Sequence, residues 1–388
     1  EMDNVGWLPC RLVPFDASSS GASVGPAGAK CTSAAWSPDG RWMYFSSDAG
    51  GAFHVWRQRF PDGKPEQITF GPTEEEGLAV APDGRSLIAS VGTQQSTLWI
   101  HDGNGERQLS SEGSAVVAGW VAFYAYFSLD GRKLYYLRQG VSRAFVSGEL
   151  WVADLESGRN ERVLPGFLMT NYDISPDDKW VAFTALDAQG RSQLWRAPLD
   201  LRYPPQEVPS SVAKYPIFAP SGELFFQDSE GNQNFIYRPK KDSTEREKVV
   251  SDPIIFLAGA SPDGKWVLAH VEVPGEQTGI PLVAFPLAGG PRMRICDDCI
   301  VRWSRDGAFL YISSRLMGRE GETFVLRVQP GKPFPALPPG GLQSRRDLAR
   351  LPVAQVIERS EITPGPHPSV YAFTQKSVHR NLYRIPLP

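Results

Sequence analysis

A four-residue turn recurs along almost the whole of this 388-residue chain and limits the folds open to it. The steps between successive copies are 44, 47, 47, 44, 42, 43 and 59 residues. A period of about 40–50 residues with strand-like flanks is typical of a β-propeller, in which each repeat forms one blade. The copies, the last of them degenerate, are Ser37-Pro38-Asp39-Gly40, Ala81-Pro82-Asp83-Gly84, Ser128-Leu129-Asp130-Gly131, Ser175-Pro176-Asp177-Asp178, Ala219-Pro220-Ser221-Gly222, Ser261-Pro262-Asp263-Gly264, Ser304-Arg305-Asp306-Gly307 and Thr363-Pro364-Gly365-Pro366.

Each copy is expected to join two strands as a hairpin. Proline at the second position presets φ for a type I turn, aspartate tolerates the third position, and glycine suits the fourth. Hydrophobic runs flank the turn, as residues 34–36 and 42–45 do for the first copy, and a third run follows at 54–57. A polar loop then leads to a fourth run at 65–69. Each repeat therefore predicts a four-stranded antiparallel blade.

The composition favours an all-β fold. Apolar residues make up 41% of the chain, and 37 glycines with 34 prolines separate the short hydrophobic runs. Many short strands joined by Gly- and Pro-rich turns are typical of sandwiches, barrels and propellers. Because the core of a propeller is shared between neighbouring blades, we expect residues 1–388 to form a single β-propeller domain.

The repeats predict eight blades, with seven blades and an irregular piece as the alternative. The last turn follows a Pro- and Gly-rich insert at 330–350, expected to be an elaborated loop before an outer strand at 352–357. The chain ends at 385–388 on a third strand that has no fourth strand after it. We expect N-terminal strands within residues 1–30 to supply the missing strand, so that N- and C-terminal strands close the propeller and leave no exposed edge.

The hairpin W-S-P-D-G-[RK], followed by the L-W and Q-[LIV]-T motifs, resembles the WD40-like (PD40) repeat of the TolB family. The resemblance covers residues 31–388. It implies a β-propeller, and the same repeat occurs in receptors, scaffolds, periplasmic partners and the non-catalytic domains of peptidases.

Three segments, at 28–40, 71–84 and 380–388, also resemble the C-terminal propellers of large bacterial signalling proteins. In those proteins the propeller follows a serine/threonine kinase domain or a winged-helix DNA-binding domain. The resemblance implies that this chain is the sensor or interaction part of such a protein. The chain begins at Glu1 without a signal peptide, so we expect it to be a processed or excised part of something longer.

Charge and hydropathy argue against two classes of partner. A formal net charge of −3 offers no electrostatic footprint for nucleic acid, and the short basic clusters at 238–241 and 345–346 are interpreted as solvated loops. No apolar stretch approaches the length needed to span a bilayer. We expect neither nucleic-acid binding nor membrane insertion by this chain.

No catalytic constellation is recognisable, so we expect no enzyme activity and no cofactor. The G-x-S-x-G match at 21–25 lies in a Ser/Gly-rich tract without the strand–turn–helix context of a nucleophile elbow. The five histidines form no H-x-H or H-x-x-x-H pair, and structural or surface roles are favoured for them.

The four cysteines form two candidate disulfide pairs. Cys296 and Cys299 form a C-x-x-C motif that lacks a thioredoxin-type context or a second ligand pair, which favours a disulfide or two simple thiols over redox chemistry or zinc. Cys10 and Cys31 lie on segments expected to border the closing blade. A disulfide between them would favour an oxidising compartment, and two thiols in a reducing cytoplasm are the equal alternative. We favour a periplasmic or other extracytoplasmic location in a bacterium.

Propeller geometry predicts a binding site at the mouth of the central channel. The loops that enter the innermost strands are expected on one face, with the S-P-D-G turns on the opposite face. Aromatic and charged residues around a concave mouth suit a peptide, a sugar or a protein loop, and packing of the tyrosines between blades is the alternative. The candidate residues are Glu74, Glu75, Glu76, Tyr124, Tyr126, Asn171, Tyr172, Lys214, Tyr215 and Arg302.

The glutamate triplet at 74–76 is the sharpest of these features. Three adjacent carboxylates repel one another unless they are solvated, paired or bound to a cation, so this segment is the candidate metal site.

The predicted function is that of a non-catalytic protein-interaction or ligand-sensing propeller. Its partner would be a protein or peptide, a small ligand or a glycan. The alternative is a metal-dependent lyase or hydrolase acting on a carbohydrate or lactone in the central channel. An enzyme of this kind requires carboxylates and histidines from different blades to converge on the channel mouth.

Overall fold

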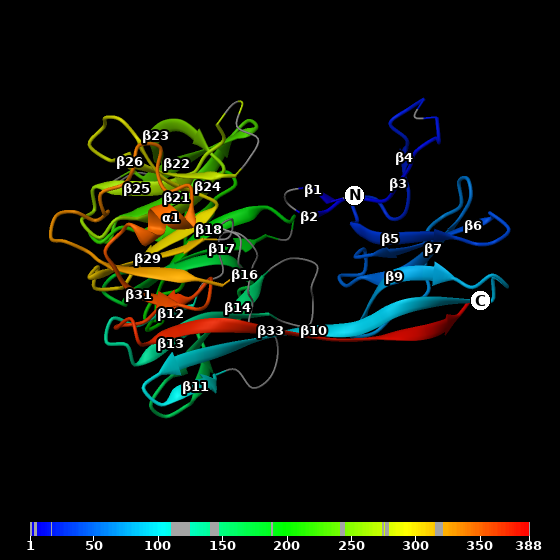
Figure 1. Ribbon diagram of the computed structural model, residues 1–388, viewed down its shortest axis with the longest axis horizontal. Helices are drawn as coiled ribbons and strands as arrows, with labels where there is room; N and C mark the ends of the chain where they lie inside the picture. Colours follow the sequence, from blue (N-terminus) through cyan, green and yellow to red (C-terminus); the bar gives the residue numbers. More distant parts are fainter. Residues whose placement is uncertain are drawn as a thin grey trace. The chain divides into compact units, whose positions relative to one another are not determined.

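The computed structural model describes residues 2–3, 6–16, 18–109, 125–139, 147–187, 189–240, 245–273, 275, 279–314 and 321–387. These residues form two compact units (Figure 1). Unit 1 comprises the described residues within 1–95 and 376–387, and unit 2 comprises those within 96–139 and 147–375. The interpretation of the whole chain as one closed propeller therefore stays a prediction, as does the number of its blades.

Unit 1 is built on a four-stranded antiparallel sheet of β5, β6, β7 and β8, which is the first predicted repeat. Strand β9 pairs with the first part of β10, and two small hairpins, β1–β2 and β3–β4, precede the sheet. The strands are β1 (Met2–Asp3), β2 (Gly6–Trp7), β3 (Arg11–Leu12), β4 (Ala22–Ser23), β5 (Cys31–Trp36), β6 (Trp42–Ser47), β7 (His54–Arg59), β8 (Glu66–Gln67) and β9 (Glu74–Val80).

Unit 2 repeats the same four-stranded antiparallel unit, as the turn period predicts. The groups are β12–β15, β16–β19, β20–β23, β24–β27 and β28–β31. Their strands are β12 (Tyr126–Phe127), β13 (Lys133–Gln139), β14 (Gly148–Asp154), β15 (Asn160–Arg162), β16 (Met169–Ile174), β17 (Trp180–Leu186), β18 (Ser192–Pro198), β19 (Gln206–Val208), β20 (Lys214–Phe218), β21 (Leu224–Glu230), β22 (Gln233–Pro239), β23 (Arg246–Ile254), β24 (Phe256–Ala260), β25 (Trp266–His270), β26 (Pro281–Pro286), β27 (Met293–Asp297), β28 (Cys299–Trp303), β29 (Phe309–Ser314), β30 (Thr323–Arg327) and β31 (Val353–Ile357).

Two strands are much longer than the repeat predicts. Strand β10 (Ser86–Asp102) has 17 residues and β33 (Tyr371–Pro386) has 16, whereas an ordinary strand has about 5–6. The repeat predicts a reversal near the middle of each segment, between its second and third runs. Neither 93–97 nor 374–380 contains the Asn-Gly or Asp-Gly pair that favours a tight reversal, and both strands run straight through.

The strands that complete the C-terminal sheet are not the ones we expected. Strand β32 (Thr363–Pro364) pairs with β33, and the sheet continues through β10 to β11 (Gly105–Gln108). Within unit 2, Trp99 stacks on Phe373 across this sheet. In this structure β3 and β4 pair with each other, and closure of the propeller by residues 1–30 stays a prediction. The requirement that β33 have a hydrogen-bonded neighbour is met by β10 instead.

The turns hold the conformation that their sequence predicts. In the third copy, the Ser128 hydroxyl donates to the Asp130 carboxylate at 2.6 Å and accepts from the Lys133 amide at 2.9 Å. The hydrogen bond from Ser128 is the main reason that the pKa of Asp130 lies below its ordinary value. Gly131 has φ 70°, the left-handed region that favours glycine.

The insert at 330–350 forms a loop with one short helix, α1 (Arg345–Ala349), capped by Ser344 and Asp347. It leads into the outer strand β31, as the sequence predicts. No helix in the described residues combines the length and the hydropathy needed to cross a membrane.

The core of unit 2 lies between neighbouring sheets, which pack through their innermost strands. Tyr126 on β12 packs edge-on against Tyr172 on β16, with ring centroids 5.2 Å apart. Strands β16, β20, β24 and β28 then follow in packing order, and β32 lies against β12. These innermost strands surround a channel, and the fold is an all-β arrangement of four-stranded antiparallel sheets.

Candidate binding site in the channel of unit 2

A cavity of about 360 Å³ lies among the innermost strands of unit 2. In each of five innermost strands, the residue two positions before the first residue of its turn belongs to the lining. These residues are Tyr126, Asp173, Ile217, Gly259 and Arg302.

The cavity extends to the turn end of the channel. Pro176, Pro220, Pro262 and Gly307, all from the recurring turns, belong to its lining. We expected the site on the face opposite the turns, whereas this cavity lies beside them.

Asp173 is the buried charge of the cavity. Its side chain accepts hydrogen bonds from the Ile174 amide at 2.9 Å and the Phe218 amide at 2.6 Å, and the Tyr126 hydroxyl also bonds to it. Burial raises the pKa of Asp173 to about 6, against the lowering effects of these hydrogen bonds and of the Arg305 charge. A perturbed carboxyl in a cavity is typical of a functional site.

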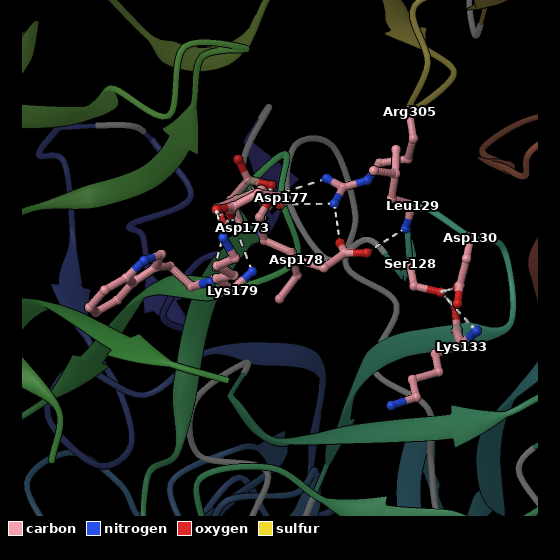
Figure 2. Close-up of polar contacts among 12 residues, drawn as sticks. Ser128, Leu129, Asp130, Lys133, Asp173, Asp177, Asp178, Lys179 and Arg305 are labelled. Atoms are coloured by element: carbon pink, nitrogen blue, oxygen red, sulfur yellow. Dashed lines mark hydrogen bonds and ion pairs between the residues drawn. The ribbon is translucent and has the colours of Figure 1, made fainter. Parts of the chain in front are cut away.

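Arg305 closes one side of the cavity by reaching from the β28–β29 turn to the β16–β17 turn (Figure 2). Its Nη1 donates to the Ile174 carbonyl at 3.1 Å and its Nη2 to the Ser175 carbonyl at 2.9 Å. Nη2 also forms an ion pair with Asp178. The other oxygen of Asp178 accepts from the Leu129 amide at 2.5 Å. Three turns are thus tied together by one arginine and one aspartate.

All three residues of this tie are departures from the S-P-D-G pattern. Leu129 and Arg305 stand where the pattern has proline, so Leu129 retains an N–H that proline lacks and Arg305 supplies a guanidinium. Asp178 stands where the pattern has glycine, and at φ 55° it adopts the left-handed conformation that aspartate tolerates. Each departure thus supplies a group that another one contacts, since Asp178 accepts from the Leu129 amide and pairs with Arg305.

The tie predicts a measurable contribution to stability. Replacing Arg305 by alanine is expected to lower the free energy of unfolding of unit 2 by about 2 kcal/mol, because hydrogen bonds to charged groups contribute about 1.5–3 kcal/mol. Urea unfolding of the full chain measures the change. The matched control is Arg132→Ala, since the Arg132 side chain is 67% exposed and lies 3.7 Å from Glu156. Equal losses in the two variants would contradict a role for the tie.

The structure brings two of the predicted site residues, Tyr126 and Arg302, to this cavity. Tyr172 is buried and donates to the Tyr135 carbonyl at 3.0 Å, so it packs between sheets. Tyr124 lies outside the described residues.

The remaining candidates of unit 2 lie outside the cavity lining. Asn171 is buried on β16, where its Oδ1 accepts no hydrogen bond within the described part of the chain. Lys214 is exposed at the start of β20, and the Tyr215 ring packs edge-on against Phe256.

The glutamate triplet lies on β9 in unit 1, and each of its carboxylates has a partner. Glu75 is buried, with its Oε2 2.9 Å from Nδ1 of His54. Arg380 on β33 pairs with Glu74 at 3.3 Å and with Glu76 at 3.0 Å. The three carboxylates are thus paired with His54 or Arg380, which relieves their mutual repulsion. Over the described residues, no group of three His, Cys, Asp or Glu side chains could hold a metal ion.

Both candidate cysteine pairs are joined by disulfides. Cys10 is bonded to Cys31 in unit 1. Cys296 is bonded to Cys299, and this bond links the end of one sheet, β27, to the innermost strand of the next sheet, β28.

Sequence reasoning missed Asp173, Gly259 and Arg305. The first two could have been found by aligning the repeats on their turns, because they occupy the same position as Tyr126 and Arg302. Arg305 could have been found as a charged residue in place of the turn proline.

No protein-family model matches the chain, and no curated protein sequence matches it. Solved structures are similar in fold. A protein assigned as TolB from Agrobacterium tumefaciens has a TM-score of 0.51 at 16% identity, covering 74% of this chain and 99% of that one. TolB from Acinetobacter baumannii has a TM-score of 0.45 at 14% identity, covering 77% and 76%. Oligogalacturonate lyase from Vibrio parahaemolyticus has a TM-score of 0.40 at 13% identity, covering 84% and 98%.

At this level of identity the comparisons concern the fold alone. The Agrobacterium structure is matched over nearly its whole length. The chain has a TolB-like β-propeller fold.

Proposed function

We propose that the chain is a non-catalytic binding propeller whose ligand site is the channel cavity of unit 2. The observation that supports this most directly is the cavity itself, about 360 Å³ in volume, in which a buried carboxylate, Asp173, lies among apolar and a few other polar residues. Ligand pockets of about 300–1,000 Å³ that combine apolar walls with a few polar groups are typical of small-molecule and side-chain binding. The expected ligand is a peptide, a segment of a partner protein or a small molecule.

The alternative function, a lyase or hydrolase in the channel, has less support. It requires histidines and carboxylates to converge, and the described lining contains Asp173 and Asp306 but no histidine. We also propose an extracytoplasmic location, because both cysteine pairs are disulfide-bonded and such bonds persist in oxidising compartments.

Filling the cavity tests the proposed site. Gly259 lines the cavity, and a Cβ at this position meets no atom within 4 Å, so its backbone accepts a side chain. We expect Gly259→Trp to abolish the retention of tetrapeptides from a mixed library, measured by affinity selection and mass spectrometry on the full chain.

Gly103→Trp is the matched control, because Gly103 is exposed, has open space around its Cβ and lies away from the cavity. Retention of the same peptides by wild type and by Gly103→Trp is expected. Their equal retention by Gly259→Trp would place the site elsewhere.

A further inference from the structure

Two charged residues of the cavity lining, Asp173 and Arg302, come from innermost strands on opposite sides of it, and the β28–β29 turn adds Arg305 and Asp306. Of the five residues that the innermost strands present at the same level, only Asp173 on β16 and Arg302 on β28 carry charges. Strands β20 and β24 lie between β16 and β28 in the packing order. At this level β20 carries Ile217, an apolar side chain, and β24 carries Gly259, which leaves open space. The cavity therefore has an acidic pole, a basic pole and an apolar wall with space beside it.

The acidic pole lacks a cation of its own. Asp173 is 7% exposed and forms no ion pair within the described residues, although three hydrogen-bond donors reach it. Arg305, the cation that acts most on Asp173, is paired with Asp178 and with two carbonyl groups. A buried carboxylate without a paired cation is unfavourable, so a ligand cation placed beside Asp173 would be stabilised there.

The basic pole is Arg302, a residue of the cavity lining. A guanidinium is charged at all physiological pH values and matches the planar geometry of a carboxylate. A ligand that is cationic at one end and carboxylate-bearing at the other would therefore complement both poles. The volume of about 360 Å³ lies near the lower end of ligand pockets and suits a small molecule of this kind.

We propose that the cavity binds a small zwitterion of the dipeptide class, with its ammonium group beside Asp173 and its carboxylate toward Arg302. This proposal rests on the proposed function, since it names the ligand of the same site. The apolar wall at Ile217 and the open position at Gly259 would receive the side chains of the ligand.

Blocking either end of the ligand tests the proposal on the wild-type chain. An equimolar pool of apolar dipeptides is titrated in three forms, free, N-acetylated and C-amidated, with binding followed by saturation-transfer NMR. We expect the free pool to bind and each blocked pool to bind at least tenfold more weakly. Equal binding of the three pools would overturn the proposal.

Two variants assign each end of the ligand to its pole. Asp173→Asn is expected to remove the preference for a free ammonium group and to leave the preference for a free carboxylate. Arg302→Gln is expected to do the reverse. If each variant lost both preferences or neither, the assignment of the poles would be wrong. The comparison of blocked pools on the wild type does not depend on whether these variants fold.

The pH dependence of binding is a further readout. With a pKa of about 6, Asp173 loses its charge as the pH falls, and the affinity for the free pool should drop about tenfold from pH 7 to pH 5. The dipeptide termini keep their charges over this range, because their pKa values are about 3.5 and 8. An affinity that does not change with pH would overturn the placement of the ammonium group at Asp173.

Failure of this proposal can be distinguished from failure of the proposed function. If tetrapeptides are retained by the wild type and lost in Gly259→Trp, but no dipeptide pool binds, the channel is the site and the zwitterion proposal is wrong. If neither tetrapeptides nor dipeptides bind, the proposed function itself fails.

Discussion

Replacing Glu75 by alanine is expected to lower the free energy of unfolding of unit 1 by about 3–5 kcal/mol, the usual cost of removing one partner from a buried pair. Glu75 is 3% exposed. Its Oε2 lies 2.9 Å from Nδ1 of His54 and accepts from Thr69 Oγ1 at 2.7 Å, and its Oε1 accepts from Thr73 Oγ1 at 2.9 Å. Truncation would leave three polar groups without their partner in a buried setting, which is costly for each of them.

Hydrogen exchange of the full chain measures this effect, because exchange in β7 and β9 reports on unit 1. The control is Glu76→Ala. Glu76 is one-third exposed, and its partner Arg380 would still be paired with Glu74 in this variant. We therefore expect the free energy of unfolding to change by only about 0–1 kcal/mol. Glu75→Gln should destabilise unit 1 less than Glu75→Ala does, because the amide can keep some of the hydrogen bonds of Glu75. A Glu75→Ala protein as stable as Glu76→Ala would show that the buried pair contributes little.

The stability of unit 2 is expected to fall by about 3 kcal/mol between pH 3 and pH 7 through Asp173 alone. Its pKa is raised from 3.8 to about 6, so between these values the folded state binds more protons at this group than the unfolded state does. Stability therefore decreases as the pH rises through this window. Below about pH 3 both states are protonated, and the penalty disappears.

The measurement compares wild type with Asp173→Asn by urea unfolding at several pH values. The absolute stability of the variant is not the test, because the amide loses one of the hydrogen bonds that the carboxylate accepts. The test is how the difference in unfolding free energy between the two proteins changes with pH. The wild type should become more stable relative to Asp173→Asn as the pH falls from 7 to 4. Asp177→Asn supplies a contrast of opposite sign, because the Ser175 hydrogen bond lowers the pKa of Asp177. A difference independent of pH would refute the raised pKa of Asp173.

Much of the fold can be read from local chemistry. The serine and aspartate of each turn bond to each other and to nearby amides within five residues, as Ser128, Asp130 and Lys133 do. Such contacts need no other part of the chain, so the turn and its two strands follow from a short segment. The turn also fixes the position of the residue two before it, and Tyr126 and Arg302 both occupy this position in the cavity lining.

The candidate site is less accessible to sequence reasoning because its contacts are long-range. Arg305 meets Asp178 across 127 residues, and Phe218 donates to Asp173 across 45. The glutamate triplet illustrates the same difficulty, since its partners His54 and Arg380 lie in distant segments. A run of carboxylates has the same sequence whether it binds a cation or forms ion pairs with other strands.

The repeat, the four-stranded sheets and the position of each S-P-D-G turn can be predicted without the structure, because they depend on backbone conformation and on hydrogen bonds between near neighbours. The folded chain was needed to reveal that β10 and β33 continue through their expected reversals and pair with each other. It also decided that Asp173 and Arg302 belong to one cavity. Strand pairing and the burial of a charge depend on which distant segments supply the neighbouring edge, the hydrogen-bond donors and the surrounding apolar surface.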